Sequence, residues 1–182
     1  MAGFRPMTIT KQTILRKRTF LYVLVVTLGL GAFYATQSVG QETMIDERSY
    51  NLGIMGGFAE VVRLGVKKLA LSEVMTPEEM DGVMDDALVI AKRNKVQMWR
   101  ETDFLVTDLY PADAATGKHV LLIYTGDTLD QYLALKADKA ILVAAGKYEG
   151  DAREEIARRF GRLLSYPESV IDELLERQTG NN

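Results

Sequence analysis

The sequence feature that most constrains this chain is an uncharged stretch that directly follows three consecutive cations. An Arg-Lys-Arg triplet ending at Arg18 precedes 23 residues without a charged side chain, residues 19–41. The strongly apolar part begins at Phe20 and ends at Ala35. A helix that spans a bilayer needs about 20 apolar residues, whereas the apolar core of a cleavable signal peptide has about 7–15. The stretch therefore predicts either a transmembrane anchor or a signal sequence.

Features at the ends of the stretch keep both interpretations open. Ser38 and Gly40 are small residues placed correctly for a signal-peptidase cut before Gln41. Tyr22 and Tyr34 lie near the two ends, as aromatic residues do at the interfaces of a spanning helix. A third interpretation, a buried helix of a soluble domain, is disfavoured because a helix that is apolar all round offers no polar face to water. We favour the anchor over the cleaved signal.

The charges beside the stretch predict its orientation. The first 40 residues contain basic side chains and no acidic ones, and such a segment stays in the cytoplasm. The favoured localisation is therefore a single pass through a bacterial inner membrane, with Phe20 to Ala35 in the lipid bilayer and the C-terminal domain in the periplasm. The alternative is a periplasmic or secreted protein released by cleavage near Gly40. The predicted parts are a cytoplasmic basic segment (1–18), the anchor or signal sequence (19–41), a linker (42–50) and an exported domain (51–182).

Charge and composition exclude several classes of function for the exported part. Residues 41–182 hold 17 basic against 25 acidic residues, a formal charge of −8. So acidic a surface repels phosphate backbones, which argues against nucleic acid as a partner. The chain has no cysteine and one histidine, so disulfides, thiolate sites, a cysteine nucleophile and a multi-histidine metal site are excluded. We expect no cofactor and no metal ion.

Periodicity predicts an α+β fold for the exported part, mainly helical and with about three short strands. Apolar residues at three- and four-residue spacing indicate helices, and Thr76, Pro77 and Glu79 form a capping box with proline at the first helical position. The apolar sequence HVLLIY, without alternation, indicates a strand covered on both faces. Helices are expected within residues 49–72, 76–94, 128–146, 151–165 and 165–178, and strands near 96–101, 103–110 and 118–125.

A second capping-box pattern, Ser165 with Glu168, begins the last predicted helix. The sequence around it, FGRLLSYPESVI, resembles the GRLLGYPECC signature of a family of uncharacterised bacterial and archaeal proteins. This chain has Ser169 and Val170 where the signature has paired cysteines, and Ser165 replaces the second glycine. A thiol or metal role of the signature therefore does not carry over. The resemblance implies only a helix–turn–helix shape.

Strand ends and loops supply the candidate functional residues, because scaffolds place binding and catalytic groups there. The residues that could line a ligand cleft are Trp99, Tyr110, His119, Tyr124 and Asp127. The carboxylates that could work in pairs as acid and base are Asp103, Asp108, Asp113 and Asp127. No G-x-S-x-G nucleophile motif and no glycine-rich phosphate loop occurs, so we assign no catalytic residue.

The leading functional hypothesis is non-catalytic. The exported domain, tethered by one helix, is expected to bind another protein of the bacterial cell envelope as an accessory subunit. Three features motivate it: the membrane stretch, the lack of a chemical constellation, and surplus helix faces in a domain with few strands. The alternatives are a periplasmic domain that binds a small ligand in an aromatic-lined cleft, and a carboxylate-dependent hydrolase.

Overall fold

The computed structural model describes residues 46–110 and 115–179 of the 182-residue chain. The chain divides into two units, Met1–Met44 and Ile45–Asn182, and the described residues belong to the second. The predicted anchor or signal sequence at 19–41 lies outside the described residues, as does Asp113. Within the described ranges, no helix combines the length and the apolar character needed to cross a bilayer.

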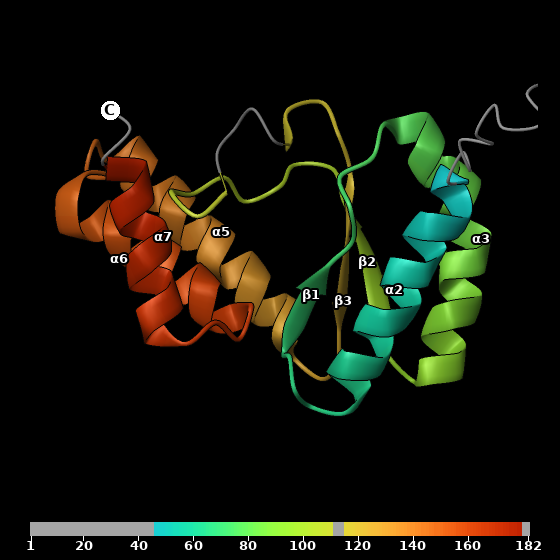
Figure 1. The fold of residues 1–182 in the computed structure, drawn as a ribbon. Coiled ribbons are helices and arrows are strands. Elements are labelled where there is room, and N and C mark those ends of the chain that lie inside the picture. Colours follow the sequence, from blue (N-terminus) through green and yellow to red (C-terminus); the bar gives the residue numbers. More distant parts are fainter. Residues whose placement is uncertain (1–45, 111–114, 180–182) are drawn as a thin grey trace, which may run out of the picture. The chain divides into compact units, whose positions relative to one another are not determined.

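The described domain is α+β, as predicted, with helices around an antiparallel sheet of three short strands (Figure 1). Strand β3, the last in sequence, lies in the middle of the order β1-β3-β2. The elements in chain order are α2 (Glu47–Arg63), β1 (Leu69–Leu71), α3 (Pro77–Asn94), β2 (Gln97–Glu101), β3 (Val120–Tyr124), α5 (Thr128–Ala144), α6 (Gly150–Leu163) and α7 (Glu168–Thr179).

The central strand β3 is buried along its whole length and divides the core into two parts. Successive side chains of a strand point to opposite faces of a sheet. Leu121 and Ile123 therefore pack with the buried residues of α2 and α3, whereas Leu122 packs with those of α5 and α6. Figure 1 shows these two pairs of helices on opposite sides of the sheet. The predicted strand covered on both faces is confirmed.

The start of α3 follows the sequence prediction closely. Thr76 Oγ1 accepts a hydrogen bond from the Glu79 amide at 3.2 Å, and Glu79 Oε2 accepts one from the Thr76 amide at 2.8 Å. These bonds from Thr76 hold the pKa of Glu79 below its usual value. The capping box thus satisfies two backbone donors that the first turn of a helix leaves unpaired.

The strand predicted near 103–110 is wrong, because other groups satisfy the backbone of that segment. Glu101 Oε1 accepts from the Asp103 amide at 2.8 Å, and the Tyr132 hydroxyl accepts from the Leu105 amide at 3.0 Å. Thr107 and Tyr110 pair their backbone groups with each other across a tight turn. We refer to residues 102–110 as the β2 loop.

The third strand of the sheet is instead β1, which lies within the segment predicted to be helical. Helix α2 ends at Arg63, and Gly65 then adopts a left-handed conformation with φ of +74°. Such a residue ends a helix at no steric cost when it is glycine. The apolar residues after it therefore leave the helical period, and Leu69 pairs with Tyr124 of β3.

Ser165 ends α6 and does not cap α7, so the second predicted capping box is wrong. Its φ of +62° is left-handed, and its Oγ accepts a hydrogen bond from the Lys68 amide at 2.8 Å. The Glu168 carboxylate accepts from Arg162 at 2.7 Å. The glycine that the family signature has at this position suits the left-handed backbone better than serine does.

Helices α6 and α7 pack closely where α6 carries a glycine. A Cβ atom added to Gly161 would lie 2.8 Å from the side chain of Ile171 in α7 and 3.0 Å from that of Leu109. Contacts this short require the surrounding groups to move. Gly161 therefore sets the approach of the two helices, and the predicted helical hairpin depends on it.

Candidate functional site

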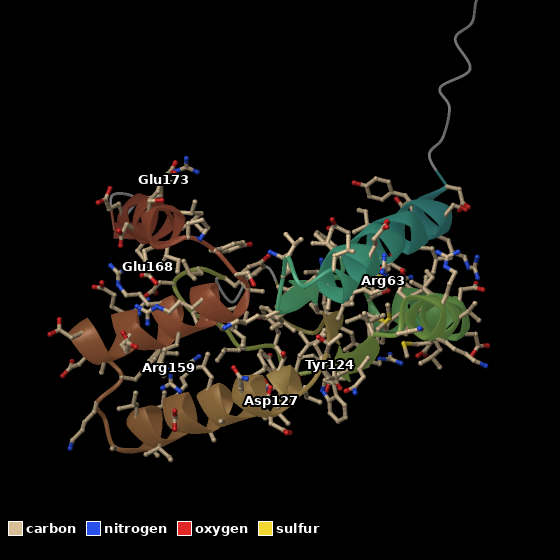
Figure 2. The ribbon with its side chains drawn as sticks, turned by 90° about the horizontal axis from the view of Figure 1, so that it is seen from below. Arg63, Tyr124, Asp127, Arg159, Glu168 and Glu173 are labelled. Atoms are coloured by element: carbon tan, nitrogen blue, oxygen red, sulfur yellow. The ribbon has the colours of Figure 1, made fainter. Side chains whose placement is uncertain are left out.

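Two of the predicted ligand-binding residues, Trp99 and Tyr124, lie on one face of the sheet, and Asp127 follows three residues after Tyr124. Trp99 pairs with Leu122, so it shares a face with Tyr124 and lies diagonally beside it. Figure 2 shows Tyr124 and Asp127 at the same end of α5. Trp99 is 45% exposed, Tyr124 is buried and Asp127 is exposed. Burial raises the pKa of the Tyr124 phenol, and the nearby Asp130 adds to this effect.

The other two predicted residues lie elsewhere. His119 precedes β3 and Tyr124 ends it, a separation of about 17 Å along a strand. The Arg100 Nε donates to His119 Nδ1 at 3.0 Å, so this ring nitrogen acts as an acceptor. Tyr110 packs edge-on against Phe104 with ring centroids 5.4 Å apart, and burial raises its pKa. His119 and Tyr110 therefore already contact other residues of the domain.

The loop aspartates are each bound by a nearby group. Asp103 forms an ion pair with Lys136 at 3.3 Å, and Asp108 forms one with Arg153. Asp127 accepts a hydrogen bond from Gln131 at 3.1 Å. Within the described residues, no group of three or more acidic or histidine side chains is placed to hold a metal ion. These contacts give the carboxylate hypothesis no support.

A buried polar cluster that sequence reasoning missed joins β2 to α5. Glu101 is almost completely buried, and its Oε2 accepts a hydrogen bond from Lys136 Nζ at 3.1 Å. Tyr132 is fully buried beside them. Burial raises the pKa of the Tyr132 phenol, and its hydrogen bond to Glu101 acts in the same direction. A buried carboxylate with a lysine and a phenol is a combination that also occurs in active sites.

The contacts of this cluster assign it a structural role. Tyr132, Lys136 and Lys139 follow one side of α5 at spacings of four and three residues. Lys136 Nζ donates to the Asp103 carbonyl, and Lys139 Nζ donates to the Val106 carbonyl at 2.6 Å. In the part of the chain that the structure describes, every buried side-chain polar atom has a hydrogen-bond partner. The side chains on the inner side of α5 thus hold the β2 loop in place by hydrogen bonds.

The opposite side of α5 is apolar and faces solvent. After Gln131, every exposed residue of this helix is apolar. Ile141 is 66% exposed and Leu133 is 40% exposed. We define the outer face of α5 as Leu133, Ala134, Ala137, Ala140, Ile141 and Ala144.

These residues form one continuous surface. At about 100° per residue, they occupy a single half of the helix circumference over roughly three turns. The other half contains Tyr132 and Leu135, which are buried, and Asp138, which pairs with Arg159 of α6 at 2.8 Å. Figure 2 shows Arg159 between α6 and α5, on the inner side of α5. Contiguous exposed apolar surfaces occur at protein–protein and membrane interaction sites.

The outer face of α5 could have been recognised from the sequence by one signal. Between Lys139 and Lys147 there is no charged residue, although the helix already has a buried apolar side. Sequence reasoning interpreted the apolar residues of this segment only as a sign of a helix. The outer face is the candidate functional site of the described domain. In comparisons with known proteins, no protein-family model, no curated protein and no solved structure matches the chain.

Proposed function

We propose that this chain is an exported protein of the bacterial cell envelope, held in the inner membrane by residues 19–41, that acts by binding protein at the outer face of α5. It does so without catalysis, as an accessory or binding subunit. The observation that carries the proposal is the outer face itself, which has no charged or polar exposed residue after Gln131.

Covering this face would release a substantial free energy. Burying apolar surface contributes about 25 cal/mol per Å², so completing the burial of Ile141 alone would contribute on the order of 1 kcal/mol. A folded domain gains nothing from exposing such side chains to water. Their exposure is therefore best understood as the free state of a contact surface.

The charge of the domain favours protein over the other partners that apolar surfaces meet. Residues 41–182 carry a formal charge of −8, which disfavours the anionic headgroups of a bacterial membrane and the phosphates of nucleic acid. The apolar stretch and the basic residues before it support the envelope location and the export of the domain.

Site-specific photo-crosslinking in living cells tests the proposal. A photoreactive amino acid replaces Ile141 on the outer face of α5, or Val89 on the outer side of α3, in the full-length chain. These two positions are matched, because they are 66% and 65% exposed. We expect a crosslinked protein adduct from position 141 and none from position 89.

The absence of a protein adduct at position 141 would contradict the proposal, as would equal adducts at both positions. A lipid adduct at position 141 would replace it with membrane contact. Fractionation of the same cells tests the location, since the anchored protein is expected in the inner membrane with its N-terminus intact.

A further inference from the structure

The geometry points to a second copy of this chain as the protein that covers the outer face of α5, with the two α5 helices paired antiparallel. This inference rests on the proposed function, because it names the occupant of the same face. The outer face has the spacing of a helix–helix seam, since Leu133, Ala137, Ala140 and Ala144 follow one another at four, three and four residues. Alternating steps of four and three residues, as in a heptad pattern, keep a stripe of side chains facing one partner helix.

The face is complementary to itself in the antiparallel direction. A twofold axis between Ala137 and Ala140 places Ala137 of one copy opposite Ala140 of the other. The same axis places Leu133, which is 40% exposed, opposite Ala144. A large side chain thus meets a small one at each end of the seam. A symmetric dimer requires such self-complementarity, because each contact occurs twice.

The charges at the two ends of α5 favour the same arrangement. Asp130 lies in the first turn, and Lys147 follows the end of the helix; both are exposed. Neither forms an ion pair with any of the residues that the structure describes. Antiparallel pairing brings Asp130 of one copy toward Lys147 of the other at both ends. Parallel pairing would instead place like charges and like ends of the helix dipoles together.

The net charge of the domain predicts how this dimer responds to salt. Two copies that each carry about eight excess negative charges repel one another at long range, and salt screens this repulsion. The apolar seam itself is not screened. The dimer is therefore expected to become tighter, not weaker, when the ionic strength is raised from about 0.05 to 0.3 M.

Cysteine crosslinking tests the pairing directly, because the natural chain contains no cysteine. Full-length chains with Leu133→Cys and Ala144→Cys, carrying different tags, are co-expressed in pairs and isolated from membranes after mild oxidation. We expect a disulfide-linked dimer from the mixed pair L133C with A144C. Neither variant should crosslink to itself. In the antiparallel pair, the same position in the two copies is separated by about 16 Å along the helix axis, which is too far for a disulfide.

Self-crosslinking of either variant, without the mixed product, would show parallel pairing and overturn the inference. A monomer in every combination, confirmed by the mass of the unmodified chain in detergent, would also overturn it. If position 141 still gives protein adducts in that case, the proposed function stands and the occupant is another protein. If position 141 gives none, the proposed function fails as well.

Discussion

Helices α3 and α5 cover opposite faces of the same sheet, but they distribute their side chains in opposite ways. The buried side of α3 is apolar, and its exposed side is mainly charged, as in most surface helices. Helix α5 directs Tyr132, Lys136 and Lys139 toward the β2 loop and leaves its apolar outer face in solvent. The two helices have almost the same length, so the difference lies in what each contacts.

This difference separates two reasons for a helix to be amphipathic. The pattern of α3 is more nearly complete within the domain, because its apolar side meets the sheet and its exposed side is charged apart from Leu88, Val89 and a glycine. The pattern of α5 is incomplete, because polar groups already fill part of its inner side while apolar groups remain outside. The following predictions test how far the inner side of α5 is structural and how far the two helical layers differ.

The largest effect is expected from Lys136→Met, which leaves the buried Glu101 carboxylate without its cation. Removing one partner of a buried ion pair costs about 3 kcal/mol of unfolding free energy. The control Lys92→Met changes an exposed lysine of α3 and should cost less than about 0.5 kcal/mol. Urea unfolding of the full-length chain in detergent, followed by the fluorescence of Trp99, measures both. Equal values for the two variants would show that Lys136 is not structural.

The next largest effect concerns the glycines of the two helical layers. Gly161→Ala should destabilise the domain by about 2 kcal/mol, because the added methyl group overlaps the side chains of Ile171 and Leu109. Gly82→Ala in α3 meets no atom within 4 Å and should stabilise the helix by about 0.5 kcal/mol. Thermal unfolding of the two variants compares them. A neutral Gly161→Ala would show that α6 and α7 can move apart.

A smaller effect, which depends on pH, is expected from Tyr132→Phe. At pH 8 the unfolding free energy of the variant should be about 1.5 kcal/mol lower than that of the wild type. The reason is that the Leu105 amide and Glu101 lose a buried hydrogen-bond partner. The pKa of Tyr132 in the folded state lies above its ordinary value of 10.0. The favourable contribution of the neutral phenol is therefore complete below pH 10 and is lost as the pH rises further.

The phenylalanine variant has no phenol to titrate at this position. The difference in unfolding free energy between wild type and variant should therefore become smaller between pH 8 and pH 11. Unfolding curves of both proteins at several pH values in this interval measure the trend. If the difference in unfolding free energy stays constant over this interval, ionisation of Tyr132 does not affect the stability of the fold.

The smallest effect is expected at Ser165, where strain and a hydrogen bond oppose each other. Ser165→Gly relieves the left-handed backbone but loses the bond from the Lys68 amide, so the net change should stay within about 1 kcal/mol. Ser165→Ala keeps the strain and loses the bond, so it should be the less stable of the two. A more stable alanine variant would contradict the left-handed conformation.

Much of the fold could be predicted because local signals agreed with the tertiary structure. The Thr76 capping box, the continuous apolar strand β3 and the helical spacing of α5 and α6 each specify their structure within a few residues. The β2 loop could not be predicted in this way. Its strand-like composition is overridden by the hydrogen bond that the Leu105 amide donates to Tyr132 and by the one that Lys139 donates to Val106, with 27 and 33 positions between the partners.

The candidate site was less accessible to sequence reasoning than the fold. Trp99 and Tyr124 share one face of the sheet and Asp127 follows soon after Tyr124, whereas His119 and Tyr110 have partners elsewhere. Whether any of them binds a ligand stays a prediction. The outer face of α5 was missed because periodicity shows that a helix has apolar residues but does not show which side the domain covers. That information exists only once α6 and the sheet are in place.

The position of β3 has a consequence for the order in which the domain can assemble as it leaves the ribosome. Both outer strands are made before the strand that pairs them, so neither can join a sheet until residues 120–124 have emerged. The hydrogen bonds from the Lys67 ammonium to Leu164 and from the Lys68 amide to Ser165 form later still, because the partners lie 97 positions apart in sequence. Contacts this distant in sequence slow folding. The domain can therefore complete its tertiary structure only after residue 165 has been synthesised.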